Sequence, residues 1–142
     1  MLSPDAKSIE ELAAILLPMG LTPIEARIQA LLTLHPEPLS LDELVEALNV
    51  SKSSASVAAR ELERHGSLQR FSEAGSKRIR YGIMDRGGGF LAAQVNFLGA
   101  FGSALHKQAR AAQSRKTAAR LKRMGDFYLR VRDALEGAIE GE

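Results

Sequence analysis

Apolar residues recur along the first third of the chain at the three- and four-residue spacing of amphipathic helices. The segment TPIEARIQALLTLH shows this pattern. Before it, residues from about 4 to 18 are expected to be helical, because Pro4 suits a first-turn position and Gly20 suits the residue after the end. In TPIEARIQALLTLH, Thr22 and Glu25 have the spacing of a capping box, in which each side chain bonds the backbone of the other residue. Ser40 and Glu43 repeat the box ahead of LDELVEALN. We therefore predict three successive helices.

The next segment, NVSKSSASVAARELERHG, predicts a helix of unusual composition over residues 51–65. Ser51 is placed to cap it, and Gly66 suits the left-handed residue after its end. Its inner face has helical spacing but small side chains, namely Ala55, Ala58, Ala59 and Leu62. A helix with such a face is slim and packs closely on its neighbour.

Two short strands are predicted after this helix, over residues 68–72 and 77–83, with a turn at the sequence EAG between them. Apolar residues alternate with Arg78 and Arg80 in the second strand, and Lys77 precedes them. The pattern predicts a β-hairpin with one packed face and a basic tip and edge.

The glycines of DRGGGF, residues 85–90, predict a break that acts as a hinge. From Phe90 onward two long helical patterns follow, and no proline interrupts them. A break near Gln113–Ser114 would make them a helical hairpin, but a single bent helix of about fifty residues fits the same pattern. Their apolar stripes predict a seam for packing against another helix, formed by Phe97, Leu98, Phe101, Leu105, Leu121, Met124, Tyr128, Val131 and Leu135. Leu129 falls outside that seam.

Composition narrows the chemistry of this chain of 142 residues. The chain has no cysteine, which excludes disulfides and thiolate metal sites. Its three histidines are scattered near different predicted helix ends, and no nucleophile elbow, phosphate-binding loop or carboxylate pair is present. We predict that the protein is not an enzyme and holds neither a metal nor a cofactor.

No segment predicts a membrane location. The N-terminus lacks the basic start and long apolar run of a signal peptide. The uncharged stretch 87–106 approaches membrane-spanning length, but its glycines and polar residues make it weakly apolar. The expected location is the cytoplasm.

Charge is strongly segregated beneath a net value of +2. Residues 1–50 carry a balance of −6, residues 51–132 a balance of +12, and the last ten residues −4. A positive field over the middle of the chain favours a polyanionic partner, whereas a merely solvated basic surface is the simpler alternative.

The helix pair and basic hairpin together favour double-stranded DNA as that partner. A helix-turn-helix lays its second helix in the major groove, which demands a slim helix with polar residues outward. Serine hydroxyls, free N–H groups of the first turn and basic side chains suit contacts with phosphates and base edges. The predicted DNA-binding residues are Ser40, Ser51, Lys52, Ser53, Ser54, Ser56, Arg60, Lys77, Arg78 and Arg80.

The segment from Gly20 to about residue 83 resembles the winged helix-turn-helix of MarR-type transcription regulators. The resemblance is most specific over residues 39–62, LSLDELVEALNVSKSSASVAAREL, and is greatest to the GbsR-like branch. It implies a dimeric regulator whose terminal helices form the dimer, so the seam residues named above become the predicted dimer interface. It also implies that residues 51–65 are the recognition helix.

Some members of that branch sense choline or glycine betaine through a cage of aromatic rings. Here Phe90, Phe97, Phe101, Phe127 and Tyr128 have helical spacing, which favours core or dimer seam over a cage. A small-molecule effector is left open and unidentified.

The predicted fold is mostly α with a small β-hairpin, a winged helix-turn-helix followed by long C-terminal dimerisation helices. Residues 1–86 are expected to form the DNA-binding domain, with the helix-turn-helix over about 40–65 and the wing over about 68–83. Residues 87–142 are expected to form the helical dimerisation region. The predicted function is a homodimeric, sequence-specific transcription regulator, with repression favoured. The alternative is a winged-helix protein-interaction module that binds no specific DNA. The sequence identifies neither the operator nor the regulated genes.

Overall fold

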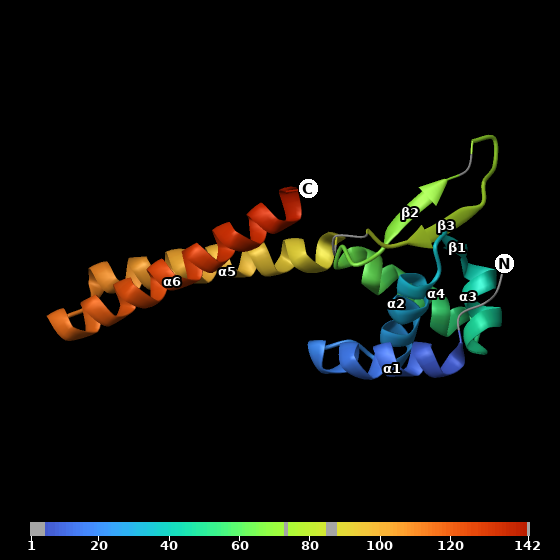
Figure 1. Ribbon diagram of the computed structural model, residues 1–142, viewed down its shortest axis with the longest axis horizontal. Helices are drawn as coiled ribbons and strands as arrows, with labels where there is room; N and C mark the ends of the chain where they lie inside the picture. Colours follow the sequence, from blue (N-terminus) through green and yellow to red (C-terminus); the bar gives the residue numbers. More distant parts are fainter. Residues whose placement is uncertain (1–4, 73, 85–87, 142) are drawn as a thin grey trace. The chain divides into compact units, whose positions relative to one another are not determined.

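The computed structural model describes residues 5–72, 74–84 and 88–141, and the chain divides into two compact units, Met1–Gly89 and Phe90–Glu142 (Figure 1). The first unit holds most of the secondary-structure elements, which come in the following order. They are α1 (Ala6–Leu16), the 3-10 turn η1 (Leu17–Met19), α2 (Pro23–Leu34), β1 (Leu39–Ser40), α3 (Leu41–Leu48), α4 (Lys52–Arg64), β2 (Gln69–Ser72) and β3 (Ile79–Gly82). The mostly helical fold with a small antiparallel sheet agrees with the predicted fold class.

The predicted capping boxes are confirmed at both helices. Thr22 Oγ1 accepts a hydrogen bond from the Glu25 N–H at 3.2 Å, and Glu25 Oε1 accepts one from the Thr22 N–H at 3.0 Å. Ser40 and Glu43 form the same pair at 3.2 and 2.9 Å. Ser51 caps α4 as predicted, since its Oγ accepts from the Ser54 N–H at 3.1 Å.

The first helix is shorter than the predicted span of 4–18. It begins at Ala6, where the Asp5 side chain caps it, and the predicted start at Pro4 lies outside the described residues. At its other end the backbone tightens into η1, and Gly20 follows in the left-handed conformation with φ of +93°. Pro18 explains the change, because proline is tolerated in the first turn of a new helix but not in a helix interior.

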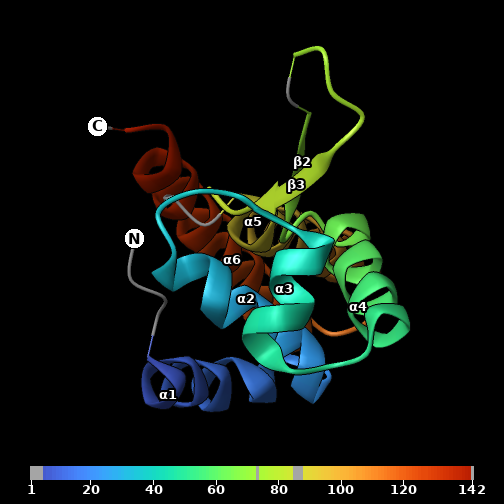
Figure 2. The same ribbon diagram turned by 90° about the vertical axis from the view of Figure 1, so that its right-hand side faces the viewer.

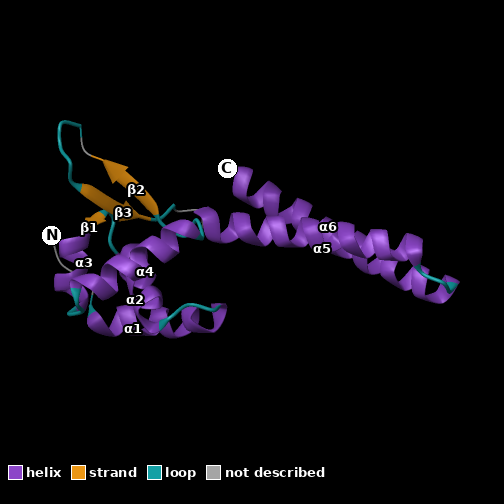
Figure 3. Ribbon diagram, turned by 180° about the vertical axis from the view of Figure 1, so that it is seen from behind, coloured by secondary structure: helices purple, strands orange, loops and turns teal. Residues whose placement is uncertain are grey.

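The predicted β-hairpin is present but its strands are shorter, and a third strand joins it (Figure 3). The strand order is β1-β3-β2, with Leu39 and Arg70 both opposite Tyr81 in antiparallel ladders. β1 was not predicted, because a strand of two residues shows no alternation of apolar and polar side chains. We use "wing" below for β2, β3 and the turn that joins them.

The core of the first unit lies among α1 to α4 and the base of the wing. Its largest fully buried side chains are Ile28, Leu31, Leu44, Leu62 and Leu68. The predicted small face of α4 is confirmed: Ala55, Ala58, Ala59 and Leu62 are all buried. Small side chains let α4 approach α2 and α3 closely while its other face stays outside.

The second unit is a helical hairpin of α5 (Gly88–Ala111) and α6 (Arg115–Glu140), which lie antiparallel and side by side (Figures 1 and 3). This resolves the alternative of one bent helix. The chain turns over residues 112–114, where Ser114 Oγ caps α6 by accepting from the Thr117 N–H at 3.0 Å. The predicted break at 85–90 is wrong over its last three residues, because residues 88–90 are helical; residues 85–87 lie outside the described residues.

Gly102 of α5 and Gly125 of α6 set the closest approach within this hairpin. A Cβ at Gly125 would lie 2.4 Å from His106 Cδ2, and one at Gly102 would lie 2.8 Å from the Leu129 side chain. Leu129, set aside in the sequence analysis, therefore packs directly against α5. The apolar stripe of α6 was read correctly as helical, but the residue that contacts the partner helix of the same chain was missed.

Candidate nucleic-acid interface

The face of α4 away from the core carries the polar residues that the sequence singled out. Figure 2 shows α3 in front of α2, with α4 beside it. Lys52, Ser53 and Arg60 are exposed on α4, and Ser54 and Ser56 are partly exposed. Val57, on the same face, is 62% exposed although it is apolar. The helix therefore presents one polar, cationic side with a single aliphatic side chain in it.

The serines of the first turn of α4 are linked to one another. Beyond its capping bond, Ser51 Oγ donates to Ser54 Oγ at 2.8 Å and lies 3.4 Å from Ser53 Oγ. Ser51 thus acts mainly as a cap, while the neighbouring hydroxyls are held in a compact cluster at the helix N-terminus. Such a terminus concentrates free N–H groups and a partial positive charge.

A shallow hollow of about 350 Å³ lies where the start of α2 meets the first two turns of α4. Its lining residues are Thr22, Ile24, Glu25, Ser53, Ser54, Val57 and Ala58. Ser53 and Ser54 were predicted to contact DNA, whereas no residue of α2 was. Nothing in the local pattern of either segment could have shown that the two lie together, because the contact is tertiary.

Two predicted DNA-binding arginines of the wing are held against α3. Arg80 Nη1 lies 3.0 Å from Glu43 Oε1, and Arg78 Nη2 donates to Ser40 Oγ at 3.3 Å. Ser40 itself is only 4% exposed. The α3 capping box is therefore also the anchor of the wing, a role that its sequence motif does not reveal.

The same arrangement lowers the pKa of the Glu43 carboxyl. The backbone N–H of Ser40 is the largest cause, and it outweighs partial burial, which acts in the opposite direction. The charges of Arg80 and Arg78 lower the pKa further. Glu43 thus stays ionised at neutral pH and neutralises part of the positive charge at the base of the wing.

The remaining cations of this unit differ in whether a carboxylate lies close enough to form an ion pair with them. Lys52 Nζ lies 3.3 Å from Asp42, and Arg70, which the sequence analysis did not single out, lies 3.6 Å from Glu63. Within the described residues, no acidic group lies in salt-bridge range of three predicted contacts. These are Arg60, Lys77 and Arg78.

The predicted dimer residues all lie on the helical hairpin, with different exposure. Leu105 is buried inside the hairpin, Leu98, Leu121, Met124, Tyr128 and Leu135 are partly exposed, and Phe97, Phe101 and Val131 are exposed. The aromatic residues were expected in a core or in the dimer seam; Phe97, Phe101 and Phe127 are exposed, so of these two only the dimer seam stays open for them as a prediction. A hairpin of two helices has no third layer that could cover these rings.

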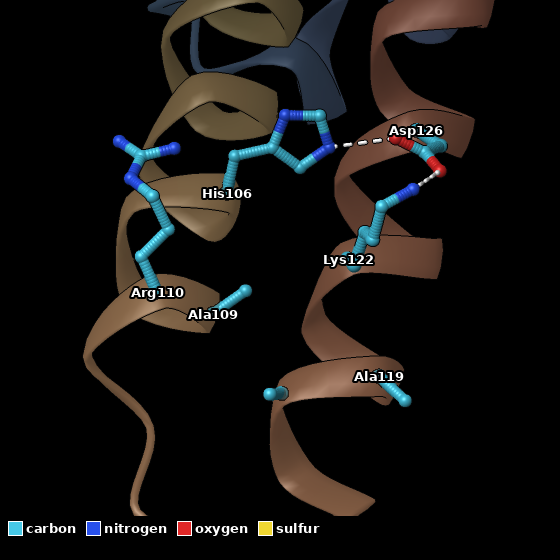
Figure 4. Close-up of a pocket in the computed structure, with 7 residues that line it drawn as sticks. His106, Ala109, Arg110, Ala119, Lys122 and Asp126 are labelled. Carbon is cyan, nitrogen blue, oxygen red and sulfur yellow. Dashed lines mark hydrogen bonds and ion pairs between the residues drawn. The ribbon is translucent and has the colours of Figure 1, made fainter. Parts of the chain in front are cut away.

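An open cleft of about 410 Å³ separates α5 and α6 toward the turn of the hairpin (Figure 4). Ala109, Ala118 and Ala119 leave the space, and an ion-pair cluster lies at one end of it. His106 Nε2 lies 2.8 Å from Asp126 Oδ1, and Lys122 Nζ lies 3.2 Å from Asp126 Oδ2. Hydrogen bonds from Lys122 and then His106 hold the pKa of Asp126 below its ordinary value.

Within the described residues, no three His, Asp or Glu side chains gather where they could hold a metal ion. No helix of the described chain is both long and apolar enough to cross a membrane.

Comparison with known proteins agrees with this geometry. Residues 19–79 match the model of the MarR family. The crystal structure of a transcriptional regulator is 22% identical, with a TM-score of 0.73 over 94% of this chain and 93% of that chain. No curated protein matches the chain.

Two further structures are more distant. MepR, a transcription regulator of the Staphylococcus aureus multidrug efflux pump MepA, is 18% identical, with a TM-score of 0.47 over 83% of this chain and 87% of its own. A MarR family protein of Mycobacterium tuberculosis, in complex with salicylic acid, is 24% identical, with a TM-score of 0.39 over 94% and 76%. Residues 19–79 therefore match the MarR family, and the chain has the fold of a solved transcriptional regulator.

Proposed function

We propose that the protein is a sequence-specific DNA-binding transcription regulator that acts as a homodimer, with repression as its mode of action. The observation that carries the proposal is the construction of α4. Its alanine face is buried and its polar face is exposed, beside a wing that carries cations. That is the form required of a helix that enters the major groove.

Each of the two regions of the chain would have its own role. Residues 1–86 would bind DNA, with α4 in the groove and the wing on the phosphate backbone, while residues 87–142 would form the dimer. Two recognition helices related by a two-fold axis would enter successive major grooves about 34–36 Å apart on a pseudo-palindromic site.

Among the basic side chains, the strongest candidates for DNA contact are those outside the ion pairs. Arg60 on α4, and Lys77 and Arg78 on the wing, meet this condition within the described residues. Arg80 is the weaker candidate, because Glu43 already neutralises part of its charge. Ser40 would act through Arg78 and the α3 cap more than through direct contact, since it is buried.

Within the MarR family, the motif LSLDELVEALNVSKSSAS supports kinship with the GbsR-like branch. A small-molecule effector is compatible with this proposal, and its identity is open. The competing function, a winged-helix module that binds another protein, lacks a comparable observation, because unpaired cations on both α4 and the wing favour a polyanion.

A gel-shift titration on genomic fragments tests the proposal. We expect at least one fragment to bind about a thousandfold or more tightly than random duplex, with affinity falling steeply as salt rises. Equal binding of all fragments at low and moderate salt would contradict sequence-specific recognition. Salt-independent capture of a protein partner, without DNA binding, would support the interaction module instead.

Single substitutions sharpen the assignment of the basic residues. Lys77→Ala and Arg78→Ala should each weaken binding to every sequence and reduce the salt slope by about one unit. Arg80→Ala should reduce the slope less, because its charge is shared with Glu43. Arg64→Ala is the matched control, since Arg64 pairs with Glu61 in the last turn of α4 and should leave the slope unchanged. A slope unaltered by Lys77→Ala and Arg78→Ala would remove the wing from the interface.

A further inference from the structure

One large apolar side chain, Val57, lies on the exposed face of α4, where it is 62% exposed. The other apolar residues of this helix are Ala55, Ala58, Ala59 and Leu62, and all four are buried. Two positions along a helix correspond to a rotation of about 200°, so Val57 lies nearly opposite both Ala55 and Ala59. Val57 therefore occupies the middle of the face that points away from the core.

The packing of α4 does not account for a valine at this position. A β-branched side chain loses rotamer freedom in a helix, so valine is a poorer helix former than alanine. A side chain that stays mostly in water also gains little from apolar burial. Its placement is therefore better explained by a contact that forms when α4 binds a partner.

The surroundings of Val57 limit what that contact can be. Ser53 lies four positions before it and Arg60 three positions after it, so both lie on the same stripe of the helix, and both are exposed. On another side, Val57 borders the hollow between α2 and α4 together with Ser54 and Ile24. A protein partner would require a wider apolar surface than one valine between a hydroxyl and a guanidinium group. The stripe suits a partner whose surface is polar and has a single apolar group in it.

Thymine presents such a surface in the major groove. Its edge carries an acceptor oxygen and the 5-methyl group, whereas the edges of the other three bases carry only hydrogen-bonding groups. An aliphatic side chain in contact with that methyl group removes apolar area of both from water. Because a recognition helix turns its outer face toward the base edges, Val57 lies where this contact would form.

We infer that Val57 packs against the 5-methyl group of a thymine and selects thymine at one position of each half-site. This rests on the proposed DNA-binding function and adds a base identity to it. The serines and arginine around Val57 would supply polar contacts, while Val57 supplies the discrimination between thymine and bases without the methyl group.

Arg60 indicates the base expected nearby. Its Nε donates to the Ser56 carbonyl oxygen at 3.4 Å, which directs the side chain back along α4. No acidic group of the described chain lies in salt-bridge range of its guanidinium, which suits bonding to guanine O6 and N7. The Cα atoms of Val57 and Arg60 differ in height by about 4.5 Å, compared with about 3.4 Å between base pairs. We therefore expect the thymine within about two base pairs of a guanine.

Replacement of thymine by uracil tests the assignment, because uracil lacks only the 5-methyl group. The probe is the genomic duplex that binds most tightly in the gel shift, with each thymine replaced in turn by deoxyuridine in both half-sites. For the wild-type protein, one replacement per half-site should weaken binding about three- to tenfold for each methyl group lost. For Val57→Ala, the thymine and uracil duplexes should bind about equally, since the partner of the methyl group is gone.

Two further variants separate this contact from its neighbours. Val57→Thr keeps one methyl group at the same position and should retain part of the preference for thymine. Arg60→Ala is the matched control, which should weaken binding but keep the full effect of uracil. Val57→Ala removes no charge, so its salt slope should equal that of the wild type, unlike the slopes of the wing variants.

The outcomes distinguish this inference from the proposed function. A uracil effect of the same size in the wild type and in Val57→Ala would overturn the inference, because the methyl group would then act through another side chain or through DNA shape. A duplex that binds specifically but shows no uracil effect would also overturn it, and would leave the proposed function intact. If no fragment binds more tightly than random duplex, the proposed function fails and this inference fails with it.

Discussion

The two units of the chain bury their apolar side chains to very different extents. In the first unit, helices and a small sheet enclose Ile28, Leu44 and Leu62, which are essentially inaccessible to solvent. In the described part of the second unit, only Gly102, Leu105 and Gly125 are buried, and its aromatic rings lie at the surface. Several layers can enclose a core, whereas a pair of helices can cover only one face of each.

The units also differ in how they use charge. In the first unit, Asp42, Glu43 and Glu63 neutralise nearby cations. Glu43 and Glu63 also hold the wing against α3 and α4 through Arg80 and Arg70. In the second unit, most basic residues near the turn have no acidic neighbour within the described chain. The difference teaches that ion pairs hold the elements of the first unit together, whereas most cations near the turn of the second unit are left without an acidic neighbour in the described chain.

The largest effect is expected from a substitution in the core of the first unit. Leu62→Ala should lower the free energy of unfolding by about 2–5 kcal/mol, because it removes a fully buried side chain and leaves a cavity. Urea unfolding followed by circular dichroism measures this. Val57→Ala, on the exposed face of the same helix, should change the value by less than about 0.5 kcal/mol. A similar loss in both variants would mean that the two faces of α4 are misassigned.

A smaller effect, confined to association, is expected in the second unit. Phe127→Asp should raise the dimer dissociation constant by about thirtyfold or more, since it places a charge among the exposed aromatic rings of the hairpin. Sedimentation at several protein concentrations measures this shift. Phe71→Asp, which changes an exposed aromatic residue of the wing, is the control and should leave the dimer intact. Dimers that survive Phe127→Asp would place the interface elsewhere.

The smallest effects concern one carboxylate in each unit. Glu43 and Asp126 both have lowered pKa values when folded, so their contributions to stability are present above the unfolded pKa and lost as pH falls through the folded one. Glu43→Gln, which keeps the capping geometry, and Asp126→Asn should therefore each reduce the loss of Tm on acidification below about pH 4. Thermal unfolding between pH 3 and 7 measures this. If the Tm of each variant falls with pH as that of the wild type does, these ion pairs contribute nothing measurable to stability.

Local signals in the sequence sufficed for much of the fold. Each of four features depends on residues only a few positions apart, so the sequence alone predicts it. These are the capping boxes at Thr22 and Ser40, the cap at Ser51 and the small face of α4. Strand alternation predicted the wing for the same reason. The candidate interface on α4 followed from these elements and stays a prediction until DNA binding is measured.

Other features depend on residues far apart in the chain. Pairing of Leu39 with Tyr81, the hold of Glu43 on Arg80 and the start of α2 beside α4 have no local signature. The helical hairpin was predicted only in part. Its apolar periodicity predicted two helices, but Gly88 and Gly89 belong to α5 and do not break the helix.

By itself, therefore, the sequence determined which segments are helices and strands, which face of α4 is small, and where positive charge is concentrated. Only the tertiary structure decided which cations are neutralised and which aromatic rings lie exposed. The physical reason is the separation in sequence over which each kind of interaction acts. Periodicity, caps and turns act between neighbours in the chain, whereas ion pairing and burial depend on what the fold brings alongside each side chain.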